Sequence, residues 1–269
     1  MARFEDYRVF RTALGGRLLE VEIGKLAEQA NGQATVRYGD TVVSCTVCAS
    51  KEPKQDVDFF PLTCNFEEKL YAVGKIPGGY IKREGRPSDK ATLTSRLIDR
   101  PLRPLFPKGY RQEIQVVCTV LSMDPSFRPD CVAMIAASSA LMNAGVPFDG
   151  PIAGIRIGRI GGEFKGFLSP EERELSPMDL VVACKDGKVM MVEAGMKEVP
   201  EETIIEAMHW AVSNVQPVLD LQRELAKQVD ATPQEYELVL PDEEILKEVA
   251  DWTAGRFGSK VRGNVMERA

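Results

Sequence analysis

The chain has 269 residues, of which 44% are hydrophobic and 28% are charged, and it carries a formal net charge of −6 at neutral pH. This composition is typical of a soluble globular protein with one large domain or two modest ones. No apolar run reaches the roughly 18 residues that a membrane-spanning helix needs, and the acidic balance does not by itself indicate a nucleic-acid-binding protein.

Glycine-containing turns divide the first part of the chain into short stretches rich in β-branched residues, which predicts strands joined by tight turns. A charged loop over residues 51–58 interrupts this pattern. The strands are expected at residues 18–23, 33–38, 41–49 and 59–66.

Residues 74–107 begin as a glycine-rich loop. Gly78 and Gly79 allow positive φ at little cost, so the side chains that follow can point outward from a tight turn. Tyr80, Lys82 and Arg83 then combine an aromatic face with two cations, the mixture that single-stranded nucleic acid needs. The alternative is an ordinary solvated loop.

A helix is predicted from the N-cap Ser88 to Arg100, because the residue before a proline is biased away from helical dihedrals. In this helix Arg96 and Arg100 would border an apolar stripe formed by Leu93 and Leu97, whereas solvated charges usually lie on the opposite face. Two interpretations remain open, an anion site at a cleft edge or buried ion pairs with Asp89 or Asp99.

The second half of the chain repeats the order of strand group and helix. A helix of small and apolar residues, expected to be buried on several faces, follows the next predicted strand, and two glycine-turned hairpins precede a long helix that Pro217 should kink or split. This order indicates an α+β fold. The elements are expected at residues 112–122, 130–144, 152–160, 163–168, 179–184, 189–193 and 201–229.

The cysteines and the histidine offer little to metal or nucleophilic chemistry. Cys45 and Cys48 have a metal-ligand spacing, but they lie in a predicted strand, where residues three apart face opposite sides. No second pair follows at zinc spacing, so the six cysteines are interpreted mostly as reduced, buried thiols. The single histidine, His209, lies in a helical pattern and provides no Ser-His-Asp constellation.

The two ends of the chain differ from its centre. Residues 1–7 contain acidic side chains and no apolar core, so they do not resemble a signal peptide, which favours the cytoplasm. Beyond residue 230 a breaker is followed by a helix opening at Pro241 and ending or loosening at Gly255, with an apolar face at Ile245, Leu246, Val249 and Trp252. About 30 residues hardly make a core, which indicates a truncated chain or a fragment of a longer one.

Residues 74–107 closely resemble the first half of the polynucleotide phosphorylase family. The similarity extends over residues 41–50, 130–150 and 178–193 and the tail from residue 242. The resemblance implies an RNase PH-like core domain at residues 1–230, in two parts at about 1–145 and 146–230. Residues 231–269 would be a linker and the start of an all-helical domain.

The same resemblance implies an activity and partners. Members of the family are ring-shaped homotrimers that degrade single-stranded RNA from its 3′ end with inorganic phosphate and Mg²⁺. A cytoplasmic enzyme is expected, with components of an RNA-degradation complex, an endoribonuclease and a helicase, as further partners. A narrow RNA channel needs only a local positive lining, which is compatible with the acidic overall charge.

The resemblance also implies that this half is not catalytic. The family's phosphate-binding serine pair matches Pro129 and Asp130, and an aspartate there would repel phosphate. Of the two metal-binding aspartates and the lysine of the catalytic half, only one aspartate is present: the three positions match Arg173, Asp179 and Val181. No catalytic and no metal-binding residue is therefore expected in this chain, and Mg²⁺ would be held elsewhere in the full-length protein.

The RNA-binding residues implied by the resemblance are Tyr80, Ile81, Lys82, Arg83, Arg86, Arg96, Arg100 and Arg103. The paired aromatics and paired arginines of the family loop have become Tyr-Ile-Lys-Arg here, so one ring and one guanidinium are missing. Two alternatives remain, a purely structural assembly domain whose arginines form ion pairs, and a stand-alone phosphorolytic exoribonuclease.

Overall fold

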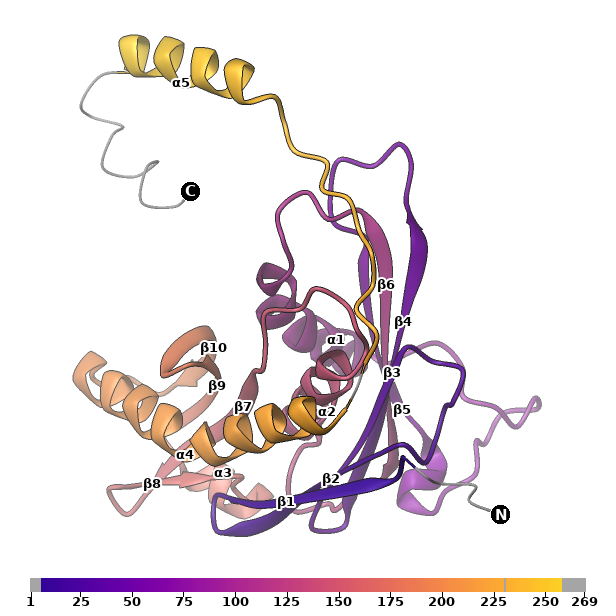
Figure 1. The fold of residues 1–269 in the computed structure, drawn as a ribbon. Coiled ribbons are helices and arrows are strands. Elements are labelled where there is room, and N and C mark those ends of the chain that lie inside the picture. Colours follow the sequence, from indigo (N-terminus) through magenta and orange to yellow (C-terminus); the bar gives the residue numbers. More distant parts are fainter. Residues whose placement is uncertain (1–5, 230, 258–269) are drawn as a thin grey trace.

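The computed structural model describes residues 6–229 and 231–257, which form two β-sheets around a buried helix (Figure 1). The first sheet has the strand order β1-β2-β3-β4-β6-β5 and is antiparallel except for the parallel pair β5–β6. Its strands are β1 (Arg8–Leu14), β2 (Arg17–Ile23), β3 (Gly32–Tyr38), β4 (Thr41–Pro53), β5 (Leu62–Glu68) and β6 (Gln112–Ser122).

The second sheet is antiparallel throughout and has the order β10-β9-β7-β8. Both of its hairpins turn at glycines with positive φ, as the sequence predicted. Its strands are β7 (Ala153–Ile160), β8 (Glu163–Gly166), β9 (Met178–Lys185) and β10 (Lys188–Met196).

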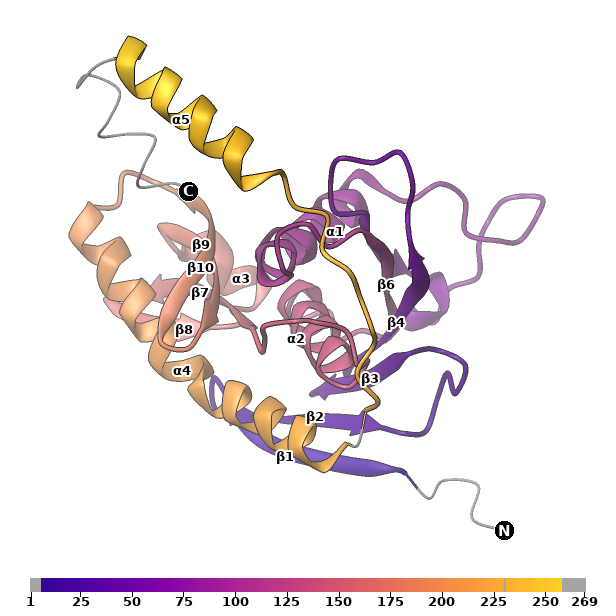
Figure 2. The same ribbon diagram turned by 45° about the horizontal axis from the view of Figure 1, so that its top comes forward.

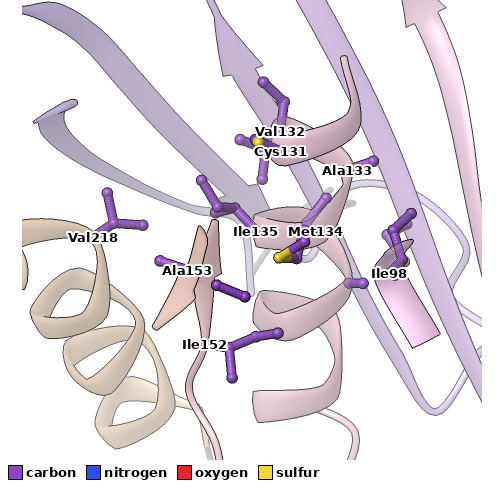
Figure 3. Packing of buried hydrophobic residues seen from close by; sticks show 14 of the residues in the cluster. Ile98, Cys131, Val132, Ala133, Met134, Ile135, Ile152, Ala153 and Val218 are labelled. Carbon is purple, nitrogen blue, oxygen red and sulfur yellow. The ribbon is translucent and has the colours of Figure 1, made fainter. Parts of the chain in front are cut away.

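Helix α2 (Asp130–Met142) lies between the two sheets and contacts β3, β4, β6 and β7. Residues 130–141 are all buried, which confirms the prediction of a helix covered on several faces. Figure 3 shows its side chains surrounded by Ile98 of the preceding helix, Ala153 of β7 and Val218 of a later helix. Small side chains on α2 allow this close approach from several directions.

The other helices lie around this core, except for the last one, which projects away from it (Figure 1). They are η1 (Leu70–Val73), α1 (Asp89–Leu102), η2 (Arg103–Leu105), α3 (Pro170–Leu175), α4 (Glu201–Gln228) and α5 (Glu243–Phe257). Helix α1 packs on β5 and α2, and α4 packs on β1 and β7. Within residues 6–229 and 231–257 no helix is both long and apolar enough to span a membrane.

Helix α1 departs from the sequence prediction in two ways. It continues past Arg100 to Leu102, because Pro101 lies in the last turn with its ring buried in the core. Leu93 is 63% exposed, so the predicted stripe of Leu93 and Leu97 is wrong. The buried face consists instead of Ala91, Thr94, Leu97, Ile98, Pro101 and Leu102.

Three further details differ from expectation. Helix α4 runs unbroken through Pro217, so of the two predicted outcomes, a kink or a split, the split is wrong. Helix α5 continues beyond Gly255 to Phe257. Strand β1 and the short helix α3 were not predicted, because β1 contains two arginines in its seven residues and α3 has only six residues.

The cysteines lie as the strand pattern predicted. Cys45 is buried and Cys48 is exposed, which confirms that the two side chains face opposite sides of β4. Cys118 of β6 is directly opposite Cys45 and is also buried. All six cysteines are free thiols, and four of them are buried.

Residues 231–242, here called the strap, cross the body between α4 and α5 (Figure 2). The amide of Gln234 donates to the carbonyl of Gly145 at 2.8 Å, and that of Val239 donates to the carbonyl of Gly109 at 2.9 Å. A Cβ at Gly145 would lie 2.3 Å from a strap carbonyl oxygen, so this close approach requires glycine. The strap is therefore part of the packed structure.

Candidate nucleic-acid interface

Residues 74–87, here called the cationic loop, reach away from both sheets (Figure 1, right). The amide of Lys82 donates to the carbonyl of Gly79 at 3.1 Å and closes a β-turn. The turn places Tyr80 and Ile81 at its two central positions, where they are 102% and 75% exposed. Lys82 itself has φ of +55°, a conformation that a non-glycine residue adopts only at a cost.

The cationic loop concentrates positive charge in an acidic chain. It contains Lys75, Lys82, Arg83 and Arg86 and a single acid, Glu84, so four positive charges against one negative give a net charge of +3, whereas the whole chain carries −6. All of these residues are exposed. An exposed aromatic ring among cations can stack on a base while the cations contact phosphates.

The start of α1 holds the C-terminal end of the cationic loop on the sheet. Ser88 caps the helix by accepting a hydrogen bond from the Ala91 amide at 3.0 Å, as the sequence predicted. The Ser88 hydroxyl and the Lys90 ammonium both donate to the Glu68 carboxylate at the end of β5, each at 3.2 Å. The loop is thereby fixed where it enters α1.

The three arginines of α1 and its C-cap have different surroundings. Arg96 is exposed, and its guanidinium has no hydrogen-bond or ion-pair partner among the residues that the structure describes. Arg100 lies 3.8 Å from the Glu193 carboxylate of β10, and both side chains are more than half exposed. Both guanidiniums are therefore accessible to an anion from solvent.

Arg103 is bound by its own chain. Its guanidinium donates to both oxygens of Asp99, at 2.7 and 2.5 Å, and to the carbonyl oxygens of Phe60 and Leu62 at 2.9 and 3.0 Å. The hydrogen bonds to Asp99 raise the pKa of Arg103. Asp99 therefore pairs with Arg103 and not with Arg96 or Arg100, and the two carbonyl contacts of Arg103 hold the end of α1 at the start of β5.

A second polar cluster lies where the resemblance placed the missing catalytic groups. Arg156 of β7 donates to Asp130, the first residue of α2, at 2.6 Å and to Asp179 of β9 at 2.5 Å. The Arg156 side chain is only 11% exposed. Burial alone would lower the pKa of Arg156, but the two carboxylates raise it, so the guanidinium stays charged between them.

Arg173 and Val181 complete this picture. The pKa of Arg173 is lowered by burial and by the positive charges of Arg128 and Arg156, so the cluster is rich in cations. Val181 of β9 is buried in the hydrophobic core. Arg156 was not predicted as a site residue. It is the only charged residue in the apolar run of residues 152–157, and a buried arginine of this kind needs an acidic partner.

Comparisons with known proteins identify the family to which the chain is related. The sequence profile for domain 1 of the 3′ exoribonuclease family matches residues 15–147, and that for domain 2 matches residues 150–214. Polyribonucleotide nucleotidyltransferase 1 of Alkaliphilus metalliredigens is 47% identical over 255 residues, which are 95% of this chain and 36% of the relative. The polyribonucleotide nucleotidyltransferase of Staphylococcus aureus (strain JH9) is 49% identical over 249 residues, 93% of this chain and 36% of the relative.

A solved structure has the same fold. A chain of the Archaeoglobus fulgidus exosome with RNA bound to the active site superposes with a TM-score of 0.56 at 21% identity, covering 80% of this chain and 88% of that chain. This likeness confirms the predicted α+β, RNase PH-like fold. The chain spans 36% of the length of the curated relatives that it matches. Together the two profiles show that the chain belongs to the 3′ exoribonuclease family and carries both of its domains.

Proposed function

We propose that this chain is the first RNase PH-like core of a polyribonucleotide nucleotidyltransferase and that it grips single-stranded RNA during phosphorolysis from the 3′ end. The observation that carries the proposal is the cationic loop, which presents Tyr80 fully exposed beside Lys82 and Arg83. The relatives at 47–49% identity bear the name of that enzyme. Phosphate attacking each terminal linkage would release nucleoside diphosphates.

The proposed RNA-binding surface continues from the cationic loop onto α1. Tyr80 and Ile81 would contact bases, and Lys82, Arg83, Arg86, Arg96 and Arg100 would contact phosphates, because none of these cations is buried. Arg103 was expected to contact RNA as well. Because its guanidinium is held by Asp99 and two carbonyls, we propose that it fixes the orientation of α1 instead.

We place the phosphorolytic chemistry outside this chain. The Arg156 guanidinium bridges Asp130 and Asp179 and so compensates the charge of both carboxylates, and Val181 stands where the catalytic pattern has a lysine. Mg²⁺ in proteins is usually bound through one or two carboxylates together with waters and substrate phosphates, and here Arg156 already pairs with both candidate carboxylates. The residues present do not fit Mg²⁺, and its site would lie in the second core of the full-length protein, where inorganic phosphate would also bind.

The remaining parts of the proposal concern domains and assembly. Residues 1–230 would form the core domain, in parts of about 1–145 and 146–230, and residues 231–269 the linker and the start of a helical domain. The strap supports a linker that is fixed on the core at its beginning. As the family resemblance implies, the full-length protein would form a homotrimeric ring with partners in RNA degradation such as an endoribonuclease and a helicase. A cytoplasmic location is proposed as well.

Two assays on the 269-residue chain test the proposal. Fluorescent poly(A) should bind the chain, whereas phosphate and Mg²⁺ should release no nucleoside diphosphate from it, with the Staphylococcus aureus relative as a positive control. Absence of RNA binding by an assembled ring would favour a structural assembly domain. Release of nucleoside diphosphate by the chain alone would mean a stand-alone exoribonuclease and would contradict the interpretation of the Arg156 cluster.

A further inference from the structure

Glu84 joins the tip of the cationic loop to the body of the protein. Its carboxylate accepts a hydrogen bond from the Leu70 amide at 3.2 Å. Leu70 is the first residue of η1, and its N-cap, Lys69, provides no side-chain hydrogen bond to the helix. The first amide of a helix needs an external acceptor, and here the acceptor comes from 14 residues further along the chain.

Few other contacts restrain the tip of the cationic loop, residues 79–84. The amide of Lys75 donates to the carbonyl of Leu70 at the base of the loop, and the turn from Gly79 to Lys82 is closed within the tip itself. A Cβ at Gly78, Gly79 or Gly85 would meet no atom within 4 Å. Among the described residues, Glu84 has the one side chain of residues 75–87 that forms a hydrogen bond with the rest of the protein.

We propose that Glu84 is a positioning residue for RNA binding, whose carboxylate, tethered to the Leu70 amide, holds Tyr80, Lys82 and Arg83 in a binding-ready arrangement. The inference rests on the proposed function, because it assigns a role within the same surface. Ordering a free loop on binding costs conformational entropy, and a loop that is already tethered loses less. Hydrogen bonds from its own amide and from that of Leu70 lower the pKa of Glu84, so the acceptor is ionised at neutral pH.

The charge of Glu84 makes the inference sharply testable. A carboxylate among cations opposes RNA binding electrostatically, so its removal should strengthen binding if charge alone matters. Removal of the tether should instead weaken binding. In Glu84→Ala, loss of the charge and loss of the tether therefore change the RNA affinity in opposite directions. Glu84→Gln removes the same charge but keeps an oxygen that can accept a hydrogen bond from the Leu70 amide.

The experiment compares three variants of the 269-residue chain by their affinity for fluorescent poly(A) and by amide hydrogen exchange. Glu67→Ala is the matched control, because Glu67 carries the same charge near η1 but pairs with Lys69 and not with the Leu70 amide. Glu84→Ala should bind RNA about threefold to tenfold more weakly, the range for one lost hydrogen bond. Glu84→Gln should remain within about twofold of the wild type, and Glu67→Ala should bind as tightly or more tightly.

Hydrogen exchange separates this inference from the proposed function. The Leu70 amide should exchange faster in Glu84→Ala and at the wild-type rate in Glu84→Gln and Glu67→Ala. Unchanged exchange at Leu70 in Glu84→Ala, or RNA affinity as high as in Glu67→Ala, overturns the role of Glu84. If the wild-type chain binds no RNA, the proposed function fails at that point, and with it the role in RNA binding, while exchange at Leu70 still decides whether the tether exists.

Discussion

The Nη2 atom of Arg156 lies 2.6 Å from the Oδ2 atom of Asp130, at the first residue of the most buried helix in the protein. Asp130 is 5% exposed, so the ion pair with Arg156 compensates the burial of its carboxylate. In the catalytic half of the family, as the resemblance implies, the residues at this end of the helix would bind phosphate. Because Arg156 compensates Asp130 from within the chain, we expect this ion pair to stabilise the fold.

Replacing Arg156 by methionine should therefore destabilise the fold strongly. Loss of one partner of a buried ion pair leaves an uncompensated charge and typically costs about 3–5 kcal/mol. Urea unfolding measures the loss, and Arg156→Met combined with Asp130→Asn should recover part of it. Arg37→Met, at an exposed position of β3, is the control and should change stability little. A loss at Arg156 no larger than at Arg37 would contradict the assigned role.

The local signals predicted most of the fold. Strand β6 was predicted with its observed ends, Gln112 and Ser122, because β-branched residues alternate there, and the Ser88 cap was correct because capping depends on a few neighbouring residues. The contacts of Arg103 with the carbonyls of Phe60 and Leu62, and the two carboxylate partners of Arg156, come from distant parts of the chain, so the sequence did not predict them. Pro101 misled the prediction because burial of its ring outweighed its local preference.

The exposure of the candidate surface was only partly foreseeable. Composition identified the cationic loop through Gly78 and Gly79, but the tether from Glu84 to Leu70 joins residues 14 apart and leaves no sequence pattern. The predicted apolar stripe of α1 was wrong at Leu93. The helical spacing of its apolar residues is compatible with more than one buried face, and packing against β5 determines which face is buried.

Alkaline pH should weaken the folded state through Tyr38. Burial raises the pKa of Tyr38 to about 12, above its usual value of about 10 in an unfolded chain. A group with a raised folded-state pKa stabilises fully below the unfolded value, and this contribution is lost as pH rises from about 10 towards 12. Urea midpoints at pH 8, 10 and 11 measure the loss. Tyr38→Phe should flatten this dependence, and an equal decline in both proteins would contradict it.

Gln234 should stabilise the core although it lies beyond the predicted core domain. Its side-chain amide donates to the Ser50 carbonyl at 2.5 Å and accepts from the Tyr110 hydroxyl at 3.2 Å. Gln234→Ala would leave these groups unsatisfied at a cost of about 1–3 kcal/mol. Urea unfolding measures the change, with Gln228→Ala, in the last turn of α4, as the exposed control. Equal midpoints for the two variants would mean that the strap adds no stability.

Replacing Lys82 and Arg83 together by alanine should weaken RNA binding and reduce its dependence on salt. Each phosphate contact with single-stranded nucleic acid contributes about −0.7 to the slope of log affinity against log salt, so the double variant should lose up to about 1.4. Lys54→Ala, which removes an exposed cation from the turn after β4, is the control. Unchanged affinity at two salt concentrations would remove the cationic loop from the RNA-binding surface.

Replacing Ile81 by phenylalanine should strengthen RNA binding. Ile81 is 75% exposed at the centre of the turn, so a larger ring fits without disturbing the core. Stacking of a base on an aromatic side chain is worth about 1–3 kcal/mol, and Tyr80 alone provides the ring in this loop. The gain should leave the salt slope unchanged, because stacking displaces no counterions. Leu93→Phe, at an exposed position of α1, is the control for added apolar surface, and an equal gain there would show that ring position does not matter.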